Sequence, residues 1–254
     1  MKQQKQQTVL VTGASQGIGA AIARAFAQSG YRVIVCARNL AKLEALAAEI
    51  NGHAYALDVS DSKAVSEVLT QIEQDLGQID ILISNAGVAI SASLTDTSDE
   101  DWSKMLAVNL TGGFYLCRHL LPGMKKRGFG RVVFVASNAG LIGYPYTSGY
   151  CASKHGTIGL MRGLAAEFAR EDLTINAICP GFVETEMAQN AISNIENRTG
   201  RSADVARASL EKINPQRRLI QCDEVAHLAL SLAHKGARGV HGQAIALDGG
   251  QVQH

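Results

Sequence analysis

Hydrophobic runs of strand length alternate with segments of helical periodicity along this chain. In the segments between the runs, apolar positions recur every three or four residues, as on one face of a helix. The runs are predicted as strands at residues 8–12, 31–37, 53–58, 79–84, 130–136, 173–178 and 243–247. Such alternation is typical of βαβ units, in which a helix links two parallel strands. We therefore expect an α/β fold with a seven-stranded parallel sheet and helices on both faces.

Two predicted helices carry specific signals, and one long segment carries none. Ser98, followed by Asp101, forms a capping pair that opens one helix. Another helix has a single apolar stripe, formed by Ile158, Met161, Leu164 and Phe168. Residues 182–220 are polar and arginine-rich and look irregular, which fits either a lid over a site or a surface excursion. No change of composition marks a second domain, so residues 1–254 are predicted to form one domain.

Composition and charge exclude several classes of protein. A chain of 254 residues with 46% hydrophobic residues can bury one sizeable core. Its 24 Lys and Arg residues balance 23 Asp and Glu residues, so we expect neither nucleic acid nor a membrane as partner. The chain contains no run of about 18 apolar residues, so no transmembrane helix is predicted. Residues 1–7 are polar and lack the apolar stretch of a signal peptide, so we expect none before the first strand.

The cysteines indicate a reducing compartment. Five are scattered along the chain without a C-x-x-C pair, an odd number that suits free, buried thiols better than a disulfide framework. We therefore expect a cytoplasmic protein. The seven histidines are dispersed as well, and no cluster has the spacing of metal ligands, so no metal site is predicted.

The first strand leads into a glycine turn with the pattern Gly13-x-x-x-Gly17-x-Gly19 and then into an alanine-rich segment of helical periodicity. This order of strand, turn and helix suits a dinucleotide, because glycines let the backbone approach the pyrophosphate and the helix N-terminus attracts its charge. The spacing differs from the general G-x-G-x-x-G fingerprint. A purely structural turn is the alternative.

The end of the second strand bears on the choice of cofactor. A carboxylate usually stands there and accepts hydrogen bonds from the adenosine ribose, but this chain has Ala37 and then Arg38. A guanidinium pairs with the 2′-phosphate that a carboxylate would repel, so we predict NADP(H). Gln16, where a second basic residue would help, is neutral. Discrimination is therefore expected to rest mostly on Arg38; a solvated residue at a helix start is the alternative.

Candidate catalytic residues follow the fifth strand. Tyr150 and Lys154 are four residues apart in a helical segment, so their side chains share one face. An ammonium beside a phenol favours the phenolate and is expected to lower the pKa of Tyr150 from about 10, making it a general acid and base. Ser137 lies at the carboxyl end of its strand, where ligands bind in open α/β sheets.

Six motifs in order resemble the classical short-chain dehydrogenases/reductases over residues 8–250. They are Thr12-Gly13-x-x-x-Gly17-x-Gly19, Asn85-Ala86-Gly87, Asn109, Ser137, Tyr150-x-x-x-Lys154 and Pro180-Gly181. The resemblance implies a single-domain Rossmann fold and a homotetramer built on the helices that carry Asn109 and Tyr150.

The same resemblance implies roles for individual residues. Tyr150 would be the general acid/base and Ser137 would orient the carbonyl. Lys154 would bind the nicotinamide ribose and lower the pKa of Tyr150, and Asn109 would hold a water for proton relay. The resemblance, the glycine turn and Arg38 together predict a cofactor site. Its residues are Gly13, Ser15, Gln16, Gly17, Ile18, Gly19, Arg38, Asp58, Val59, Asn85, Ala86, Gly87, Tyr150, Lys154, Pro180, Gly181, Val183 and Thr185.

The substrate is predicted to be a small-molecule ketone or alcohol. Residues 176–185 and 150–156 look most like 3-oxoacyl-thioester reductases and polyketide ketoreductases, so we expect an acyl group on acyl carrier protein or coenzyme A. Basic residues Lys125, Lys126, Arg127 and Arg131 would dock that carrier or simply sit in solvent at a helix end. Two alternatives stay open: a dehydrogenase of a bulky, cyclic or catabolic secondary alcohol, and a non-catalytic NADP-sensing protein.

Overall fold

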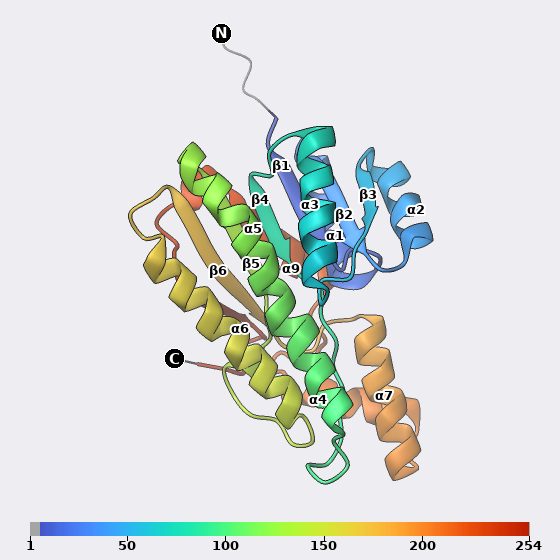
Figure 1. The fold of residues 1–254 in the computed structure, drawn as a ribbon. Helices are drawn as coiled ribbons and strands as arrows, with labels where there is room; N and C mark the ends of the chain where they lie inside the picture. Colours follow the sequence, from blue (N-terminus) through green and yellow to red (C-terminus); the bar gives the residue numbers. More distant parts are fainter. Residues whose placement is uncertain (1–5, 254) are drawn as a thin grey trace.

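The computed structural model describes residues 6–253, which form one parallel sheet covered by helices on both faces (Figure 1). Its seven strands lie in the order β3-β2-β1-β4-β5-β6-β7. They are β1 (Thr8–Thr12), β2 (Arg32–Ala37), β3 (His53–Ala56), β4 (Ile81–Ser84), β5 (Gly130–Val135), β6 (Leu173–Pro180) and β7 (Ala244–Leu247). The predicted fold class and all seven strands are confirmed, with ends shifted by at most two residues.

Two hydrophobic cores, one on each face of the sheet, hold the helices in place. One core packs α1 (Gly17–Gln28), α2 (Leu40–Ile50) and α9 (Cys222–Ala233) against the sheet. The other packs α3 (Ser62–Leu76), α5 (Gly112–Arg127) and α6 (Ser148–Glu167). Because both faces are covered, the central strands are apolar on both sides, and β1 and β5 are buried along their whole length.

A long helix runs from the carboxyl ends of the strands toward their amino ends. It starts at α4 (Asp99–Leu106), where the Ser98 hydroxyl accepts a hydrogen bond from the Asp101 backbone N–H at 3.0 Å, as the capping pair predicts. The π-helical segment η1 (Ala107–Thr111) then joins α4 to α5 without a break. There are also two 3₁₀ turns, η2 (Asn138–Gly140) and η3 (Lys235–Ala237).

The prediction of an irregular segment at 182–220 is wrong in one respect, because most of it is helical. It forms α7 (Glu186–Thr199) and α8 (Ala203–Ile213), which pack on each other through a small core of their own. Each helix buries only a narrow stripe, Ala188 and Ile192 in α7 and Ala206 and Leu210 in α8. Outside these stripes both helices are mostly polar, and this overall polarity explains why the segment looked irregular.

The topology places a crevice at the carboxyl ends of the strands. The chain moves outward from β1 to β2 and β3, then returns to β4 on the other side of β1. The loops after β1 and β4 therefore diverge to opposite faces and leave an opening between them, where open α/β sheets bind ligands. None of the helices within residues 6–253 combines the length and apolarity that crossing a membrane requires.

Candidate active site

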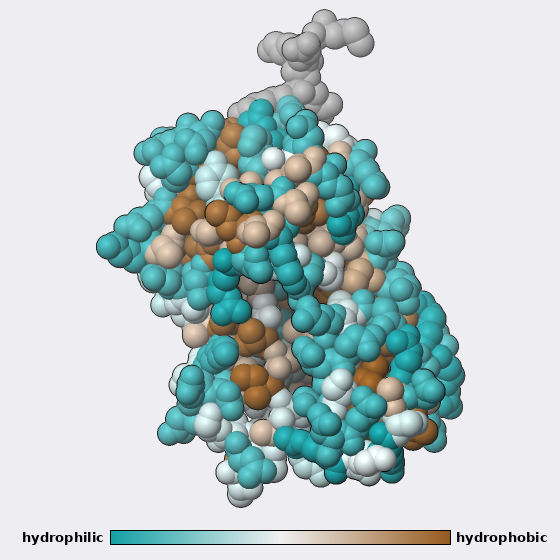
Figure 2. Space-filling view, turned by 90° about the vertical axis from the view of Figure 1, so that its right-hand side faces the viewer, coloured by the Kyte–Doolittle hydropathy of each residue, from teal (hydrophilic) through white to brown (hydrophobic). Residues whose placement is uncertain are grey.

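A cavity of about 420 Å³ lies at this crevice. Its wall brings together the glycine turn after β1, the loops after β2 and β4, the start of α6 and the start of α7. Figure 2, which faces the side of the molecule that carries α2 and α7, shows a hollow near mid-height between an upper and a lower mass of side chains. Most of the predicted cofactor residues line it, whereas Pro180, Gly181 and Val183 only lead toward it, and the predicted catalytic residues Asn109 and Ser137 lie outside its lining.

The glycine turn leaves the N-terminus of α1 open toward the cavity. Gly17 has φ +56°, a left-handed conformation, and a Cβ there would lie 3.3 Å from Thr185 Cγ2. A Cβ on Gly19 would meet the Gly13 carbonyl oxygen at 2.5 Å. The first turn of α1 has no acidic residue and no side-chain cap, so its backbone N–H groups and the helix dipole favour a bound anion. The turn therefore fits the pyrophosphate of a dinucleotide.

Arg38 reaches the cavity from the end of β2, as predicted, and it is not the only cation there. Its charge helps to lower the pKa of Asp58, although the main cause is the hydrogen bond that Asp58 accepts from the Ser60 hydroxyl at 2.6 Å. Lys42 also lines the cavity, a residue that the sequence analysis missed. Asn39 caps α2 by accepting from the Lys42 N–H at 3.1 Å, so a cap-based placement of α2 would have put Lys42 in its first turn beside Arg38.

Asn85 and Asn109 brace the loops around the cavity. The amide nitrogen of Asn85 donates to the carbonyls of Thr12 and Gly13 at 2.9 and 3.2 Å and so ties the loop after β4 to the glycine turn. Asn109 lies in η1, where one extra residue per turn rotates its side chain toward the Val88 backbone. It accepts from the Val88 N–H at 2.8 Å and donates to the Val88 carbonyl at 2.9 Å. The π-helical turn is a second feature that the sequence analysis missed.

Helix α6 presents Tyr150 and Lys154 to the cavity, on one face as predicted. Lys154 Nζ lies 5.7 Å from the centroid of the Tyr150 ring and donates to the Val135 carbonyl at 3.0 Å. Burial lowers the pKa of Lys154 to about 8. Ser137, at the end of β5, accepts from the Ala139 N–H at 3.1 Å and lies next to Tyr150.

The expected lowering of the Tyr150 pKa is not what the structure shows. Burial raises this pKa to about 12, and the opposing effect of the hydrogen bond with Ser137 is smaller. The ammonium of Lys154 does not offset the burial, because it lies over the ring and its proton is directed at a backbone carbonyl. Tyr150 is therefore protonated at neutral pH, the state of a proton donor.

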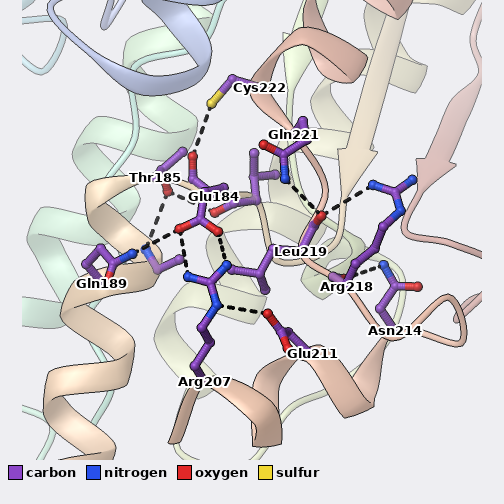
Figure 3. Close-up of polar contacts among 12 residues, drawn as sticks. Glu184, Thr185, Gln189, Arg207, Glu211, Asn214, Arg218, Leu219, Gln221 and Cys222 are labelled. Carbon is purple, nitrogen blue, oxygen red and sulfur yellow. Dashed lines mark hydrogen bonds and ion pairs between the residues drawn. The ribbon is translucent and has the colours of Figure 1, made fainter. Parts of the chain in front are cut away.

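The segment 182–220, which we call the lid segment, is fastened to the end of β6. Val183 pairs with Ile220 in a parallel bridge, so the two ends of the segment lie side by side. Figure 3 shows the Arg207 guanidinium of α8 between the carboxylates of Glu184 and Glu211. Thr185 caps α7 by accepting from the Ala188 N–H at 3.4 Å. Since Thr185 also lines the cavity, the contacts of Glu184 fix the lid segment beside the site.

The basic residues near the end of α5 do not form a docking site beside the cavity. They lie at the amino ends of the strands, since α5 ends just before β5 begins, whereas the cavity is at the carboxyl ends. Arg131 is only 1% exposed and binds Asp172 at 3.1 Å, and Lys125 lies 3.5 Å from Glu171. Arg131 is therefore unavailable for docking, and docking of a carrier by Lys125, Lys126 and Arg127 stays a prediction. No group of three or more potential metal ligands occurs within residues 6–253.

Comparison with known proteins identifies the family. The model of the short chain dehydrogenase family matches residues 7–196. The chain belongs to the short-chain dehydrogenases. The acetoacetyl-CoA reductase of Rhizobium meliloti is 37% identical over 246 residues, which cover 95% of this chain and 97% of that protein. The D-beta-hydroxybutyrate dehydrogenase of Cupriavidus necator is 35% identical over 254 residues, with 96% and 97% covered.

A solved structure of this family has the same fold throughout. A variant of the actinorhodin polyketide ketoreductase, solved with NADPH, superposes with a TM-score of 0.95 at 34% identity and covers 100% of both chains. As a short-chain dehydrogenase, the protein is an oxidoreductase that acts on CH–OH and C=O groups and binds a nicotinamide cofactor. The open glycine turn and the cations around the cavity fit such a cofactor.

Proposed function

We propose that this protein uses NADPH to reduce the ketone of a 3-oxoacyl thioester, carried on acyl carrier protein or coenzyme A, to a secondary alcohol. One observation carries the proposal: the phenol of Tyr150 lines the cavity next to Ser137, and burial raises its pKa to about 12, so it is protonated at neutral pH. A protonated phenol can give its proton to the oxygen of a ketone as that oxygen gains negative charge. Bound NADPH supplies the hydride.

Each predicted catalytic residue has a role that its contacts support. Tyr150 donates the proton, and Ser137 beside it hydrogen-bonds the carbonyl oxygen and orients it. Lys154, held by the Val135 carbonyl, reaches the ribose hydroxyls from the same helix face. The side chain of Asn109 is engaged with Val88 and Ser153, so we assign it the positioning of the loop after β4. The water relay through Asn109 stays a prediction.

Arg38 supports NADPH as the cofactor. It stands in the cavity wall where an NAD-specific site usually has a carboxylate, and its guanidinium can hold a 2′-phosphate by two parallel hydrogen bonds. We assign Asp58 and Val59 to the adenine, Asn85, Ala86 and Gly87 to the ribose, and Thr185 to the carboxamide. All of these residues line the cavity.

The substrate assignment is supported by relatives, and one relative favours a second candidate. Acetoacetyl-CoA reductase and the polyketide ketoreductase act on oxo groups by their names, as the proposal requires. D-beta-hydroxybutyrate dehydrogenase, at 35% identity, favours oxidation of a free 3-hydroxy acid. We propose that the lid segment covers the bound substrate, because Thr185, Glu186 and Met187 at its start line the cavity.

We further propose a cytoplasmic homotetramer. All five cysteines are free thiols, which suits a reducing compartment. The helix that runs from α4 into α5 leaves Trp102 and Phe114 42% and 40% exposed, and large apolar side chains of this kind are common in subunit interfaces. Light scattering of the purified protein measures the mass directly.

Steady-state kinetics tests the proposed reaction. NADPH and NADH oxidation would be followed with acetoacetyl-coenzyme A, longer 3-oxoacyl thioesters and bulky cyclic ketones, and NAD(P) reduction with 3-hydroxybutyrate. We expect thioester turnover with NADPH, and turnover confined to 3-hydroxybutyrate with NAD would establish the second candidate. Tyr150→Phe should abolish turnover while NADPH still binds, whereas Tyr146→Phe, a control at a 65% exposed position, should change nothing. Biological function that is unchanged in Tyr150→Phe, without turnover, would favour the NADP-sensing protein.

A further inference from the structure

Three side chains form a chain of hydrogen bonds across the mouth of the cavity. Lys42 Nζ, from α2, donates to Gln16 Oε1 at 2.9 Å. Gln16 Nε2, from the glycine turn, donates to Glu186 Oε2 at 2.5 Å. Glu186 is the first residue of α7, so the chain of bonds links the adenosine end of the cavity to the lid segment. All three residues line the cavity. Neither the motifs nor the proposed function gives Lys42 a role, and Glu186 has so far served only as part of the cavity wall.

The orientation of the Gln16 amide follows from its two partners. The carboxylate of Glu186 accepts only, so the NH₂ end of the amide faces it, and the oxygen must then face Lys42. An ammonium has three donors, and Gln16 occupies one of them. Lys42 therefore stands at the mouth with two N–H donors left for a ligand. Because its long side chain is already held, it loses less conformational freedom on binding than a free lysine would.

The positive charge of Lys42 lies at the end of the cavity where Arg38 would bind the 2′-phosphate. Arg38, at the end of β2, and Lys42, in the first turn of α2, line the same end of the cavity. A phosphate that Arg38 engages through two of its oxygens has a third oxygen free for a second cation. Gln16 itself cannot serve as that cation, since it is neutral. It can hold one, because its side chain keeps Lys42 beside the glycine turn.

We propose that Lys42 is a second determinant of NADPH specificity, held in position by Gln16, whose amide is in turn oriented by Glu186 of the lid segment. This inference rests on the proposed use of NADPH. Lys42 touches the ligand, whereas Gln16 and Glu186 act through it as positioning residues. The lid segment thereby contributes to the choice of cofactor as well as to the cover of the substrate.

Equilibrium binding of NADPH and NADH, measured by the fluorescence of the reduced nicotinamide at fixed ionic strength, tests the role of Lys42 without turnover. Lys42→Met should weaken NADPH binding about tenfold, the typical effect of one charge-assisted hydrogen bond, and change NADH binding less than twofold. Lys42→Arg should keep the wild-type ratio of the two dissociation constants. Lys63→Met is the matched control, since Lys63 also lies in the first turn of a helix and is 84% exposed.

Gln16→Met tests the relay. It should weaken NADPH binding about threefold in the wild-type background and have no effect in the Lys42→Met background, because the residue it positions is then gone. Glu186→Gln should behave like Gln16→Met, since a glutamine no longer dictates the orientation of the amide. Equal effects of Gln16→Met in both backgrounds would overturn the relay.

The outcomes separate this inference from the function on which it rests. A wild-type protein that binds NADH more tightly than NADPH overturns the proposed cofactor itself. A preference for NADPH that survives Lys42→Met overturns the role of Lys42 alone. Equal losses for both cofactors in Lys42→Met, without recovery in Lys42→Arg, would also overturn it, because they would show damage to the fold instead of a lost phosphate contact.

Discussion

The buried ammonium of Lys154 should make the stability of this protein rise with pH in the alkaline range. Lys154 is 5% exposed, and burial lowers its pKa from 10.5 to about 8. Below pH 8 the lysine is charged in both the folded and the unfolded chain, and folding carries the full cost of burying the charge. Between the two pKa values the folded chain has lost the proton and the unfolded chain still binds it, so the free energy of unfolding increases.

The size of the effect follows from the shift. One pKa unit corresponds to about 1.4 kcal/mol, so the charge costs about 3 kcal/mol at neutral pH. Lys154→Met removes the titration. The free energy of unfolding of the wild type, minus that of the variant, should therefore rise by about 3 kcal/mol from pH 7 to pH 11. The lost hydrogen bond to the Val135 carbonyl displaces the whole difference curve by about 1–3 kcal/mol and leaves its slope unchanged.

Urea unfolding, followed by circular dichroism at several pH values, measures this difference. Groups that titrate in the same range and do not interact with Lys154 are shared by the two proteins and cancel. Cys179 is the exception, because the charge of Lys154 lowers its pKa, and both proteins therefore carry Cys179→Ala. Lys63→Met is again the control, because it makes the same replacement at an exposed position. A flat curve for Lys154→Met would refute the reasoning, since it would mean that the ammonium is solvated in the folded protein.

Three further predictions concern the walls of the cavity. Gly19→Ala places a Cβ 2.5 Å from a backbone carbonyl, so we expect a loss of about 2 kcal/mol in thermal unfolding together with weaker NADPH binding; an unchanged melting temperature would contradict it. Asn109→Leu leaves both polar groups of the Val88 backbone without partners, which should cost about 3 kcal/mol in urea unfolding, whereas wild-type stability would rule out this bracing role. Glu184→Gln should speed tryptic cleavage of the lid segment severalfold at pH 7, because it weakens the link to Arg207; Glu211→Gln, which changes a contact within α8, should not.

Local patterns were sufficient for the sheet and for most of the site. The central strands are buried on both faces, so they are continuous apolar runs, and their positions could be predicted to within two residues. Gly17 needs its positive φ, and the spacing of Tyr150 and Lys154 puts both side chains on one helix face. These properties depend on residues that are close together in the sequence, so they can be predicted from the sequence.

Only the tertiary structure determined the pKa values of buried groups and the contacts between residues that are far apart in the sequence. The pKa of Tyr150 goes up instead of down because burial outweighs nearby charge, and burial depends on every element packed around the residue. The basic residues at the end of α5 lie at the amino ends of the strands, away from the cavity, and Arg131 in β5 is buried. Lys42, Gln16 and Glu186 come from three elements, and Gln16 and Glu186 are 170 residues apart. The sequence by itself therefore determined the seven strands and the chemistry that follows them, but not the helices α7 and α8. The folded structure decided which charges meet, because electrostatic energies depend on distance and solvent exposure, and neither follows from local periodicity.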